Sequence, residues 1–260
     1  MSAAVSVSRR GRGPDLVLLH GWAMHRGVWG GAAESLSEHF RVHLVDLPGH
    51  GDSNHLPLVA DLSRVAAAVR QQVPAGAWLG WSLGGLVALQ AALQAPGRVT
   101  RLIAVAANPS FVSRPAWPDG VDAAVFSGFA RDLSRDFQGT LNRFLLLESL
   151  GSDTARADLA RLRAGLESGR PPAPEALRAG LELLRGSDLS GRLGELGVPS
   201  LWLAGGRDRL VPPQAMAQAA ARAPGASSAV IPGAGHAPFI GHEREFVRTV
   251  STFMQARAAA

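Results

Sequence analysis

Short apolar runs alternate with segments of helical periodicity over the first part of this chain. The predicted strands are Asp15–His20, Arg41–Leu47, Ala77–Gly80 and Arg101–Ala106, and the predicted helices between them are Val28–His39, Asp61–Val73 and Ser82–Ala95. Short runs that are apolar at every position are typical of strands buried on both faces. A strand, helix, strand order favours a parallel sheet with helices on both sides. The sequence therefore predicts an α/β fold with a mostly parallel central sheet.

The pattern changes between Ser110 and Leu189, where no β-branched run occurs and helical segments follow one another directly. The predicted helices there are Ala123–Leu133, Gly139–Leu150, Asp153–Leu166 and Glu175–Leu184. Strands return at Ser200–Ala204 and Ser228–Ile231, with helices at Pro213–Arg222 and Glu243–Ala256. We therefore expect residues 1–109 and 190–260 to form an α/β core, and residues 110–189 to form an inserted, all-helical lid.

Composition limits the kind of protein further. With 47% hydrophobic and 18% charged residues, the chain is expected to be soluble and globular. It has no cysteine, which excludes disulfide scaffolds, thiol nucleophiles and thiolate metal sites. No apolar stretch reaches the roughly 20 residues of a membrane span, and the first residues contain no signal-peptide pattern. We expect a cytoplasmic monomer without a membrane partner.

The sequence pI of about 11.3 suggests a nucleic-acid partner at first sight. The formal net charge is only +5, however, and all 26 basic residues are Arg. With no Lys, Tyr or Cys, almost nothing titrates between the amino terminus and Arg, so a small excess of Arg gives a very high pI. No Arg run is interleaved with aromatic residues, and a nucleic-acid partner is not expected.

The motif Gly-Trp-Ser-Leu-Gly at residues 80–84 lies between a predicted strand and a predicted helix. This context is that of a nucleophile elbow, a tight turn that exposes a serine hydroxyl above the sheet. The turn strains the serine backbone, and side chains two residues to either side would collide. The alternative is an ordinary turn with an unreactive serine. The flanking elements favour Ser82 as a nucleophile.

A serine hydroxyl is a weak nucleophile at neutral pH and needs a base and an orienting acid. Asp208 and His236 follow in the required chain order, each directly after a different predicted strand. Taken singly, Asp208 could be a turn residue and His236 an ordinary loop histidine. Together they predict a triad in which Ser82 attacks, His236 carries the proton and Asp208 orients the imidazole.

Acyl transfer also requires donors for the developing oxyanion. The backbone N–H of Leu83, next to the nucleophile, is expected to supply one of them. The turn after the first predicted strand is expected to supply the other through the N–H of Trp22, whose indole would wall the acyl pocket. His20 is expected to support this loop structurally.

Five motifs along the chain together resemble those of an α/β-hydrolase. They are His20-Gly-Trp22, Asp46-Leu-Pro-Gly-His-Gly-Asp-Ser53, Gly80-Trp-Ser-Leu-Gly-Gly85, Gly205-Gly-Arg-Asp208 and Gly235-His-Ala-Pro-Phe-Ile240. The elbow motif and the lid segment at residues 143–156 narrow the resemblance to the pimeloyl-[acyl-carrier protein] methyl ester carboxylesterases of biotin synthesis. The resemblance covers nearly the whole chain and implies an α/β-hydrolase fold with a helical lid.

The resemblance implies that the lid holds the pimeloyl chain of the substrate. The substrate-binding residues expected on this basis are Trp22, Ser82, Leu83, Phe144, Leu145, Leu146, Leu147, Glu148 and His236. Helical spacing supports part of this set, because Phe144 and Glu148 are four residues apart and share a face. The family pattern has a neutral amide where this chain has Glu148. In the alternative interpretation, Phe144 is lid core and Glu148 is a solvated charge.

The resemblance also implies that basic lid residues meet an acidic acyl-carrier protein. Arg143 and Arg156 match by motif, and Arg161 and Arg163 are candidates by position. From residue 110 to residue 189 the chain has ten Arg against eleven Asp and Glu, so any basic patch must be local. The alternative for each Arg is a solvated helix face.

The sequence lacks the motifs that several other enzyme classes require. Dehalogenase and epoxide hydrolase chemistry needs a carboxylate at the position that Ser82 occupies. No H-E-x-x-H and no G-x-x-x-x-G-K-[ST] motif occurs, so neither a metal nor a cofactor is expected.

The triad and the resemblance together imply a serine carboxylesterase that converts pimeloyl-[acyl-carrier protein] methyl ester to pimeloyl-[acyl-carrier protein] and methanol in biotin biosynthesis. The same triad is compatible with a general short-chain esterase, a lactonase, a thioesterase or a carbon–carbon bond hydrolase. It is also compatible with a low-turnover ligand-binding receptor on the same fold.

Overall fold

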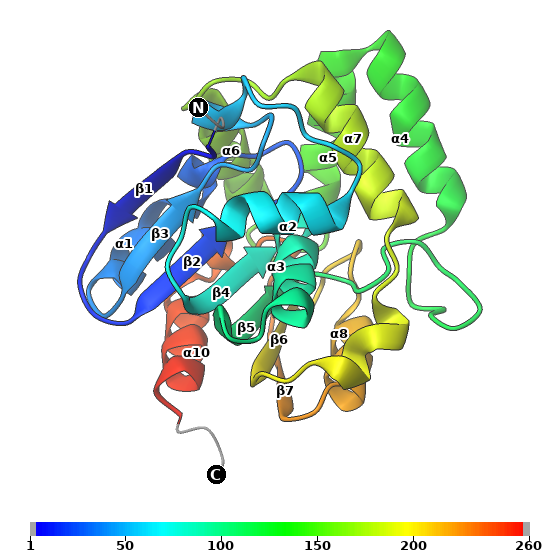
Figure 1. The fold of residues 1–260 in the computed structure, drawn as a ribbon. Helices are drawn as coiled ribbons and strands as arrows, with labels where there is room; N and C mark the ends of the chain where they lie inside the picture. The colour runs from blue at the N-terminus through cyan, green and yellow to red at the C-terminus, as the bar shows by residue number, and fades with distance from the viewer. Residues whose placement is uncertain (1–3, 257–260) are drawn as a thin grey trace.

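A computed structural model describes residues 4–256, and its centre is one seven-stranded sheet (Figure 1). The strands in chain order are β1 Val7–Arg10, β2 Asp15–Leu19, β3 Arg41–Val45, β4 Gly76–Trp81, β5 Val99–Val105, β6 Ser200–Gly205 and β7 Ala226–Ile231. Their spatial order is β1-β3-β2-β4-β5-β6-β7. Neighbouring strands are parallel except for the antiparallel pair β1 and β3. The mostly parallel sheet predicted from the sequence is confirmed.

The edge strand β1 has no counterpart among the predicted strands. Its sequence, Val-Ser-Arg-Arg, is partly exposed and lacks the apolar run that marks the buried strands. It pairs with β3 from Val7 opposite Val45 to Arg10 opposite Val42. Charged side chains on an edge strand oppose the addition of a further strand from another molecule. The sequence signal of β1 is weak because edge strands of this kind are polar.

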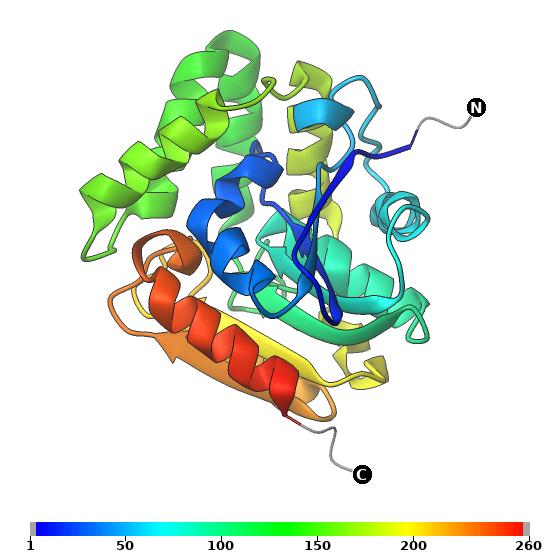
Figure 2. The same cartoon turned by 90° about the vertical axis from the view of Figure 1, so that its left-hand side faces the viewer.

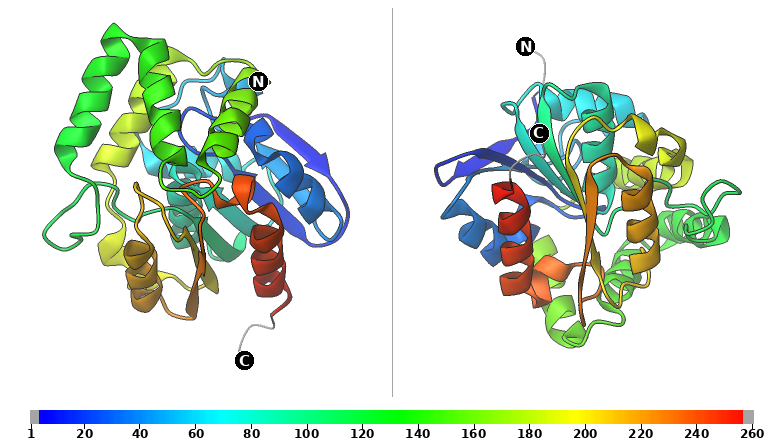
Figure 3. Two further views of the ribbon diagram at one scale, coloured as in Figure 1. Left: turned by 180° about the vertical axis from the view of Figure 1, so that it is seen from behind. Right: turned by 90° about the horizontal axis from the view of Figure 1, so that it is seen from below.

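Helices cover both faces of the sheet. The helices that pack on it or border it are α1 Gly30–Ser37, α2 Leu62–Arg70, α3 Leu83–Gln94, α8 Pro213–Arg222, α9 Pro238–Gly241 and α10 Glu243–Gln255, with the 3-10 turns η1 Arg26–Trp29, η2 Gly51–Ser53 and η3 Ser190–Glu195. Helices α1 and α10 lie together on one face (Figure 2), and α2, α3 and α8 cover the other (Figure 3).

Strand β2 shows why the apolar runs fold as they do. Leu16 and Leu18 belong to the core beneath α1 and α10, whereas Val17 and Leu19 belong to the core beneath α2 and α3. Successive side chains of a strand point to opposite faces, and here both faces are covered. The four buried positions of the strand, Leu16 to Leu19, are therefore all apolar.

The predicted continuous helix over Val28–His39 is wrong at its start. The segment begins with the 3-10 turn η1, and α1 starts only at Gly30. Gly30 has φ 39° and ψ −125°, a conformation that breaks the helical path and that glycine adopts at little cost. The prediction, which rested on hydrophobic periodicity, did not account for the change of chain direction at Gly30.

Four further helices lie between β5 and β6 in the part of the chain that the structure describes. They are α4 Ala123–Arg135, α5 Phe137–Ser149, α6 Ala155–Glu167 and α7 Pro174–Gly186. They stand together at one end of the sheet (Figures 1 and 3). The division into core and lid at residues 110–189 stays a prediction, and its outermost residues, 1–3 and 257–260, lie outside the described residues. No helix within residues 4–256 is long and apolar enough to span a bilayer.

Helix α3 packs closely on the sheet because Gly84 has no side chain. A Cβ atom at this position would lie 2.3 Å from the carbonyl oxygen of Leu19 and 2.5 Å from that of His20. Both obstacles are backbone atoms of the β2 region, which cannot turn aside as a flexible side chain would. At Gly97, in the turn after α3, a Cβ atom would meet nothing within 4 Å.

We expect Gly84→Ala to lower the free energy of unfolding by about 1–3 kcal/mol, because the new methyl group must displace backbone in a packed core. Gly97→Ala is the matched control and should stay within about 0.5 kcal/mol of the unchanged protein. Urea unfolding at constant pH measures both values. Equal stability of the two variants would contradict the close packing of α3 on β2.

Candidate active site

Ser82 occupies the turn between β4 and α3. Its backbone has φ 54° and ψ −118°, a strained conformation for a residue with a side chain. Its N–H donates to the carbonyl of Val105 at 3.0 Å, which ties the turn to β5. A Cβ atom at Gly80 would lie 2.2 Å from the carbonyl oxygen of Gly84. The strained turn and the need for glycine on both sides of the serine are therefore as predicted.

Asp208 and His236 are in direct contact, although 28 residues separate them in the chain. Asp208 follows β6, His236 follows β7, and His236 Nδ1 lies 2.8 Å from Asp208 Oδ2. The other carboxylate oxygen of Asp208 accepts from the N–H groups of Leu210 at 2.8 Å and Val211 at 3.0 Å. These bonds fix the Asp208 side chain, and its contact with Nδ1 orients the imidazole of His236.

The backbone of His236 is held from two sides. Its N–H donates to the carbonyl of Glu148 in α5 at 3.1 Å. Its carbonyl accepts from the indole N–H of Trp81 at 2.8 Å, and Trp81 directly precedes Ser82. The loop of His236 is therefore hydrogen-bonded both to helix α5 and to the elbow that carries the serine.

The link between Ser82 and His236 is not closed by a hydrogen bond. Within residues 4–256, His236 Nε2 is buried without a hydrogen-bond partner, and the Ser82 hydroxyl makes no bond to it. Such contacts are often long without substrate and shorten in the reacting complex. The structure thus joins Asp208 to His236 directly, and joins Ser82 to them through its neighbour Trp81.

His20 supports the loop that carries Trp22, as predicted. Its Nδ1 pairs with the carbonyl of Gly21 at 2.8 Å, and its Nε2 accepts the N–H of Leu47 at 3.0 Å. Burial lowers the pKa of His20 well below its ordinary value, and neighbouring His50 adds to the effect. A neutral His20 therefore joins the loops that follow β2 and β3.

The two predicted oxyanion donors lie under helix α7. Trp22 donates its indole N–H to the carbonyl of Leu177 at 2.9 Å. A Cβ atom at Gly180 would lie 2.6 Å from Trp22 Cδ1 and 3.6 Å from Leu83 Cδ2, so both side chains touch the same turn of α7. Leu83 is the first residue of α3, where a backbone N–H has no intrahelical partner. Ala23, directly after Trp22, has φ 65°, a second strained residue at this site.

Aromatic side chains of α4 and α5 form a row of ring contacts that begins at Trp22. The Phe144 ring meets the Trp22 ring edge to face with 4.6 Å between centroids, and Phe129 of α4 meets Phe144 at 5.8 Å. These residues belong to the core that also contains Leu83. Buried apolar packing thus extends from the elbow into α4, α5 and α7.

The remaining lid residues predicted to bind substrate point in different directions. Leu145 packs with Leu162 in the other core of the molecule. Leu146 is 49% exposed on the outer side of α5, and Leu147 is half-buried against the core that contains Phe144. Consecutive helix positions are 100° apart, so a run of five residues cannot share one channel.

Glu148 is not the solvated charge of the alternative interpretation. It is 1% exposed, and within the described residues neither of its carboxylate oxygens has a hydrogen-bond partner. Burial raises the pKa of Glu148 well above its ordinary value of 4.5, and the charge of Asp208 adds to the effect. Both effects favour the protonated form of Glu148.

The four arginines predicted to meet a carrier protein differ in their surroundings. Arg143 lies 3.2 Å from Asp132 and 3.7 Å from Asp136. Arg161 donates to the carbonyl of Ile240. Arg156 and Arg163 are exposed, and no ion pair engages either one in the part of the chain that the structure describes. Arg163 lines a cavity of about 310 Å³ between α5 and α6.

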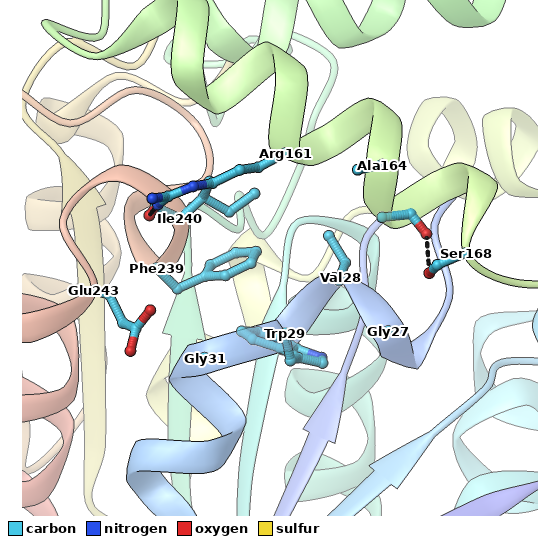
Figure 4. Close-up of a pocket in the computed structure, with 12 residues that line it drawn as sticks. Gly27, Val28, Trp29, Gly31, Arg161, Ala164, Ser168, Phe239, Ile240 and Glu243 are labelled. Carbon is cyan, nitrogen blue, oxygen red and sulfur yellow. Dashed lines mark hydrogen bonds between the residues drawn. The ribbon is translucent and has the colours of Figure 1, made fainter.

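A further cavity of about 360 Å³ lies between α6, η1 and α9 (Figure 4). Figure 4 shows Phe239 and Trp29 on one side of it and Arg161 reaching across toward Ile240. Phe239 also packs on Trp81, with 5.1 Å between ring centroids. None of Ser82, Asp208 and His236 lines this cavity.

Several residues that support the site could not be identified from sequence patterns. Trp81 lies within the elbow motif, but its bond to the His236 carbonyl joins residues 155 positions apart. The carbonyls of Glu148 and Leu177 act through the backbone, so no residue type marks them. Buried, neutral His50 could have been found only from its neighbourhood, because lone histidines are common in loops.

Comparison with known proteins identifies similar chains. The family described as alpha/beta hydrolase fold matches residues 14–243. The chain is 50% identical over 246 residues to a pimeloyl-[acyl-carrier protein] methyl ester esterase of Xanthomonas campestris pv. campestris (strain B100), covering 95% of this chain and 97% of that protein. It is 49% identical over 250 residues to the protein of the same name from Stenotrophomonas maltophilia (strain K279a), covering 96% of each.

Among solved structures, the esterase from Exiguobacterium antarcticum is similar with a TM-score of 0.87. The two chains are 23% identical, and the match covers 97% of this chain and 96% of that one. At this identity the likeness concerns the fold.

The buried histidines behind the Trp22 loop make the stability of the protein depend on pH. The rings of His20 and His50 lie 5.1 Å apart. Burial lowers the pKa of His50 from 6.5 to about 4, and His50 Nδ1 pairs with the carbonyl of Pro48 at 2.9 Å. Because folding favours the neutral form, this stability is present above the ordinary pKa and is lost as the pH falls from 6.5 through about 4.

We expect His50→Gln to reduce the loss of stability between about pH 7 and about pH 5, because glutamine does not titrate and its amide can donate to Pro48. His55→Gln, an exposed residue of the same loop, is the matched control and should retain the acid sensitivity. Urea midpoints at both pH values measure the difference. The same loss in all three proteins would refute the role of His50.

Proposed function

Since this chain belongs to the α/β-hydrolase family and, within it, to the pimeloyl-[acyl-carrier protein] methyl ester esterases, we propose that it hydrolyses the methyl ester of pimeloyl-[acyl-carrier protein]. The products are pimeloyl-[acyl-carrier protein] and methanol, and the reaction belongs to biotin biosynthesis. The contact of Asp208 with His236 at 2.8 Å, beside the strained elbow of Ser82, is the observation that best supports the chemistry.

In the proposed first half-reaction, Ser82 Oγ attacks the ester carbonyl while His236 Nε2 accepts the hydroxyl proton. The free, buried Nε2 atom supports this role, because its lone pair is not engaged elsewhere within the described residues. The tetrahedral intermediate collapses as the imidazolium returns its proton to the departing methoxy oxygen. Methanol leaves, and the pimeloyl group remains bound to Ser82 as an ester.

In the second half-reaction, water attacks the acyl-enzyme, and His236 accepts a proton from it. Collapse of the second tetrahedral intermediate returns Ser82 to its hydroxyl form and frees the carboxylate of the pimeloyl chain. Asp208 fixes the tautomer of His236 and stabilises the imidazolium in both steps. We assign the N–H groups of Leu83 and Trp22 as the donors to the oxyanion.

We propose that the lid, residues 110–189, supplies the acyl channel. Phe144 and Phe129 extend the apolar wall that begins at Trp22, which supports their contact with a hydrocarbon chain. Of the other predicted lining residues, Leu147 and Glu148 face the same core or the triad loops, whereas exposed Leu146 suits the lid surface.

For the carrier protein, we propose a local contact at the exposed Arg156 and Arg163, which form no ion pair within the described residues. Arg143 and Arg161 already interact within the chain, so they suit this role less well. Contacts of this kind act mainly on the encounter rate and its salt dependence. The monomeric state and the cytoplasmic location stay predictions from the sequence.

Ser82→Ala should abolish turnover, because no other group supplies the nucleophile. Asp208→Asn should lower kcat by about 10⁴ by favouring the wrong imidazole tautomer, as in other serine triads. Steady-state kinetics with a methyl ester substrate measures both variants, and thermal unfolding checks that they are folded. Folded variants with near-normal rates would remove the proposed triad.

The substrate assignment is tested by comparing kcat/KM for pimeloyl-[acyl-carrier protein] methyl ester with kcat/KM for short free methyl esters. We expect the carrier-bound ester to react at least tenfold faster (about 1.4 kcal/mol), because it also contacts the lid and its arginines. Equal or faster hydrolysis of short esters would favour a general esterase and leave the triad intact. A fluorophosphonate probe that fails to label Ser82 would instead favour a ligand-binding receptor.

A further inference from the structure

Glu148 is a buried carboxyl group that the proposed mechanism does not use. It lies at the end of α5, and both of its oxygens lack a partner within residues 4–256. Its own backbone carbonyl, however, accepts the N–H of His236 at 3.1 Å. Glu148 thus binds the His236 loop through its backbone, while ionisation of its buried side chain is energetically unfavourable.

Charged and titratable residues lie in the segments next to Glu148. Asp208 and His236 come from the loops after β6 and β7, and Asp208 is close enough for its charge to act on Glu148. The turn after α5 touches the Asp208 loop, since a Cβ atom at Gly151 would lie 2.5 Å from the Arg207 carbonyl and 3.5 Å from Arg209 Nε.

On the lid side, Asp158 of α6 is also buried, but its oxygens accept from the hydroxyls of Ser152 at 2.6 Å and Thr154 at 2.9 Å. Asp153 pairs with His242 at 3.2 Å. Asp208 and these two lid carboxylates are therefore compensated, whereas no cation or donor compensates Glu148 within the described residues.

We propose that Glu148 is a positioning residue that holds the His236 loop in place only while its side chain carries a proton. This inference rests on the proposed function of His236. When the proton passes to solvent, the carboxylate must gain water or move toward it, because a buried charge without a partner is strongly disfavoured. Movement of Glu148 pulls its backbone carbonyl away from the His236 amide and displaces the imidazole.

A second effect acts in the same direction. The tetrahedral intermediates of ester hydrolysis carry a negative charge, and so does the carboxylate product. An ionised Glu148 adds a second negative charge beside Asp208 and repels these species. Both effects slow turnover once the pH rises above the pKa of Glu148 and leave the enzyme unaffected while Glu148 is neutral.

Glu148→Gln is the direct test, because glutamine keeps the shape of the protonated side chain and cannot ionise. We measure kcat and KM for a neutral methyl ester from about pH 5 to about pH 10, with the hydroxide-catalysed rate subtracted. For the unchanged enzyme, kcat should fall by about tenfold per pH unit above the pKa of Glu148, with KM changed by less than about twofold. Glu148→Gln should keep its plateau over the same range.

Glu38→Gln is the matched control, since Glu38 is exposed at the end of α1. It should reproduce the alkaline fall of the unchanged enzyme. Coincident pH profiles of the unchanged enzyme and Glu148→Gln would overturn the proposal.

Stability gives a readout that does not depend on turnover. Folding favours protonated Glu148, so its contribution is fully present below the ordinary pKa of 4.5 and is lost as the pH rises through the raised pKa. The Tm of Glu148→Gln should therefore exceed that of the unchanged protein increasingly as the pH rises from about 4 to about 9. A constant Tm difference would show that Glu148 does not titrate there and would overturn the proposal.

The two proposals fail in different ways. If Ser82→Ala retains turnover, the triad assignment fails whatever the pH profiles show. If Ser82→Ala is inactive and a fluorophosphonate labels Ser82, but Glu148→Gln shows the same alkaline fall as the unchanged enzyme, only the role of Glu148 fails.

Discussion

The site depends on backbone segments that approach each other with no side chain between them. A Cβ atom at Gly80 would lie 2.2 Å from the Gly84 carbonyl, and one at Gly205 would lie 1.9 Å from the Gly235 carbonyl. The first contact lets α3 start directly above β4 with Ser82 in its strained conformation. The second lets the loops after β6 and β7 run side by side, so that Asp208 reaches His236. Because the strands are parallel, all of these turns lie at the carboxyl end of the sheet.

The helices between β5 and β6 take part in building this end of the sheet. Two of their backbone carbonyls, at Glu148 and Leu177, accept hydrogen bonds from His236 and from the indole of Trp22. These bonds fix the proposed base and the loop of a proposed oxyanion donor. A movement of α5 or α7 would therefore change the geometry of the reacting groups together with access to them, which links substrate entry to the alignment of the site.

The sequence predicted the parallel sheet because β2, β4 and β6 are buried on both faces and are therefore largely apolar. It predicted Ser82, Asp208 and His236 as candidates because their spacing relative to strands is a local property. It did not predict β1, whose polar residues suit an edge, or the break at Gly30, which depends on a single backbone conformation. Glu148 contacts His236 through backbone atoms alone, and the indole of Trp81 bonds to a backbone carbonyl of His236, so neither contact shows in the sequence which distant residue it reaches.

Glu148 and Asp208 are two buried carboxyl groups of one site with very different surroundings. Asp208 accepts hydrogen bonds from two backbone N–H groups and pairs with the imidazole of His236. Within the described residues, the oxygens of Glu148 have no such partner, and burial beside the charge of Asp208 raises the pKa of Glu148. A protonated carboxyl group has nearly the shape and polarity of a neutral amide. Burial at this position therefore opposes a second negative charge beside Asp208, although the residue is acidic.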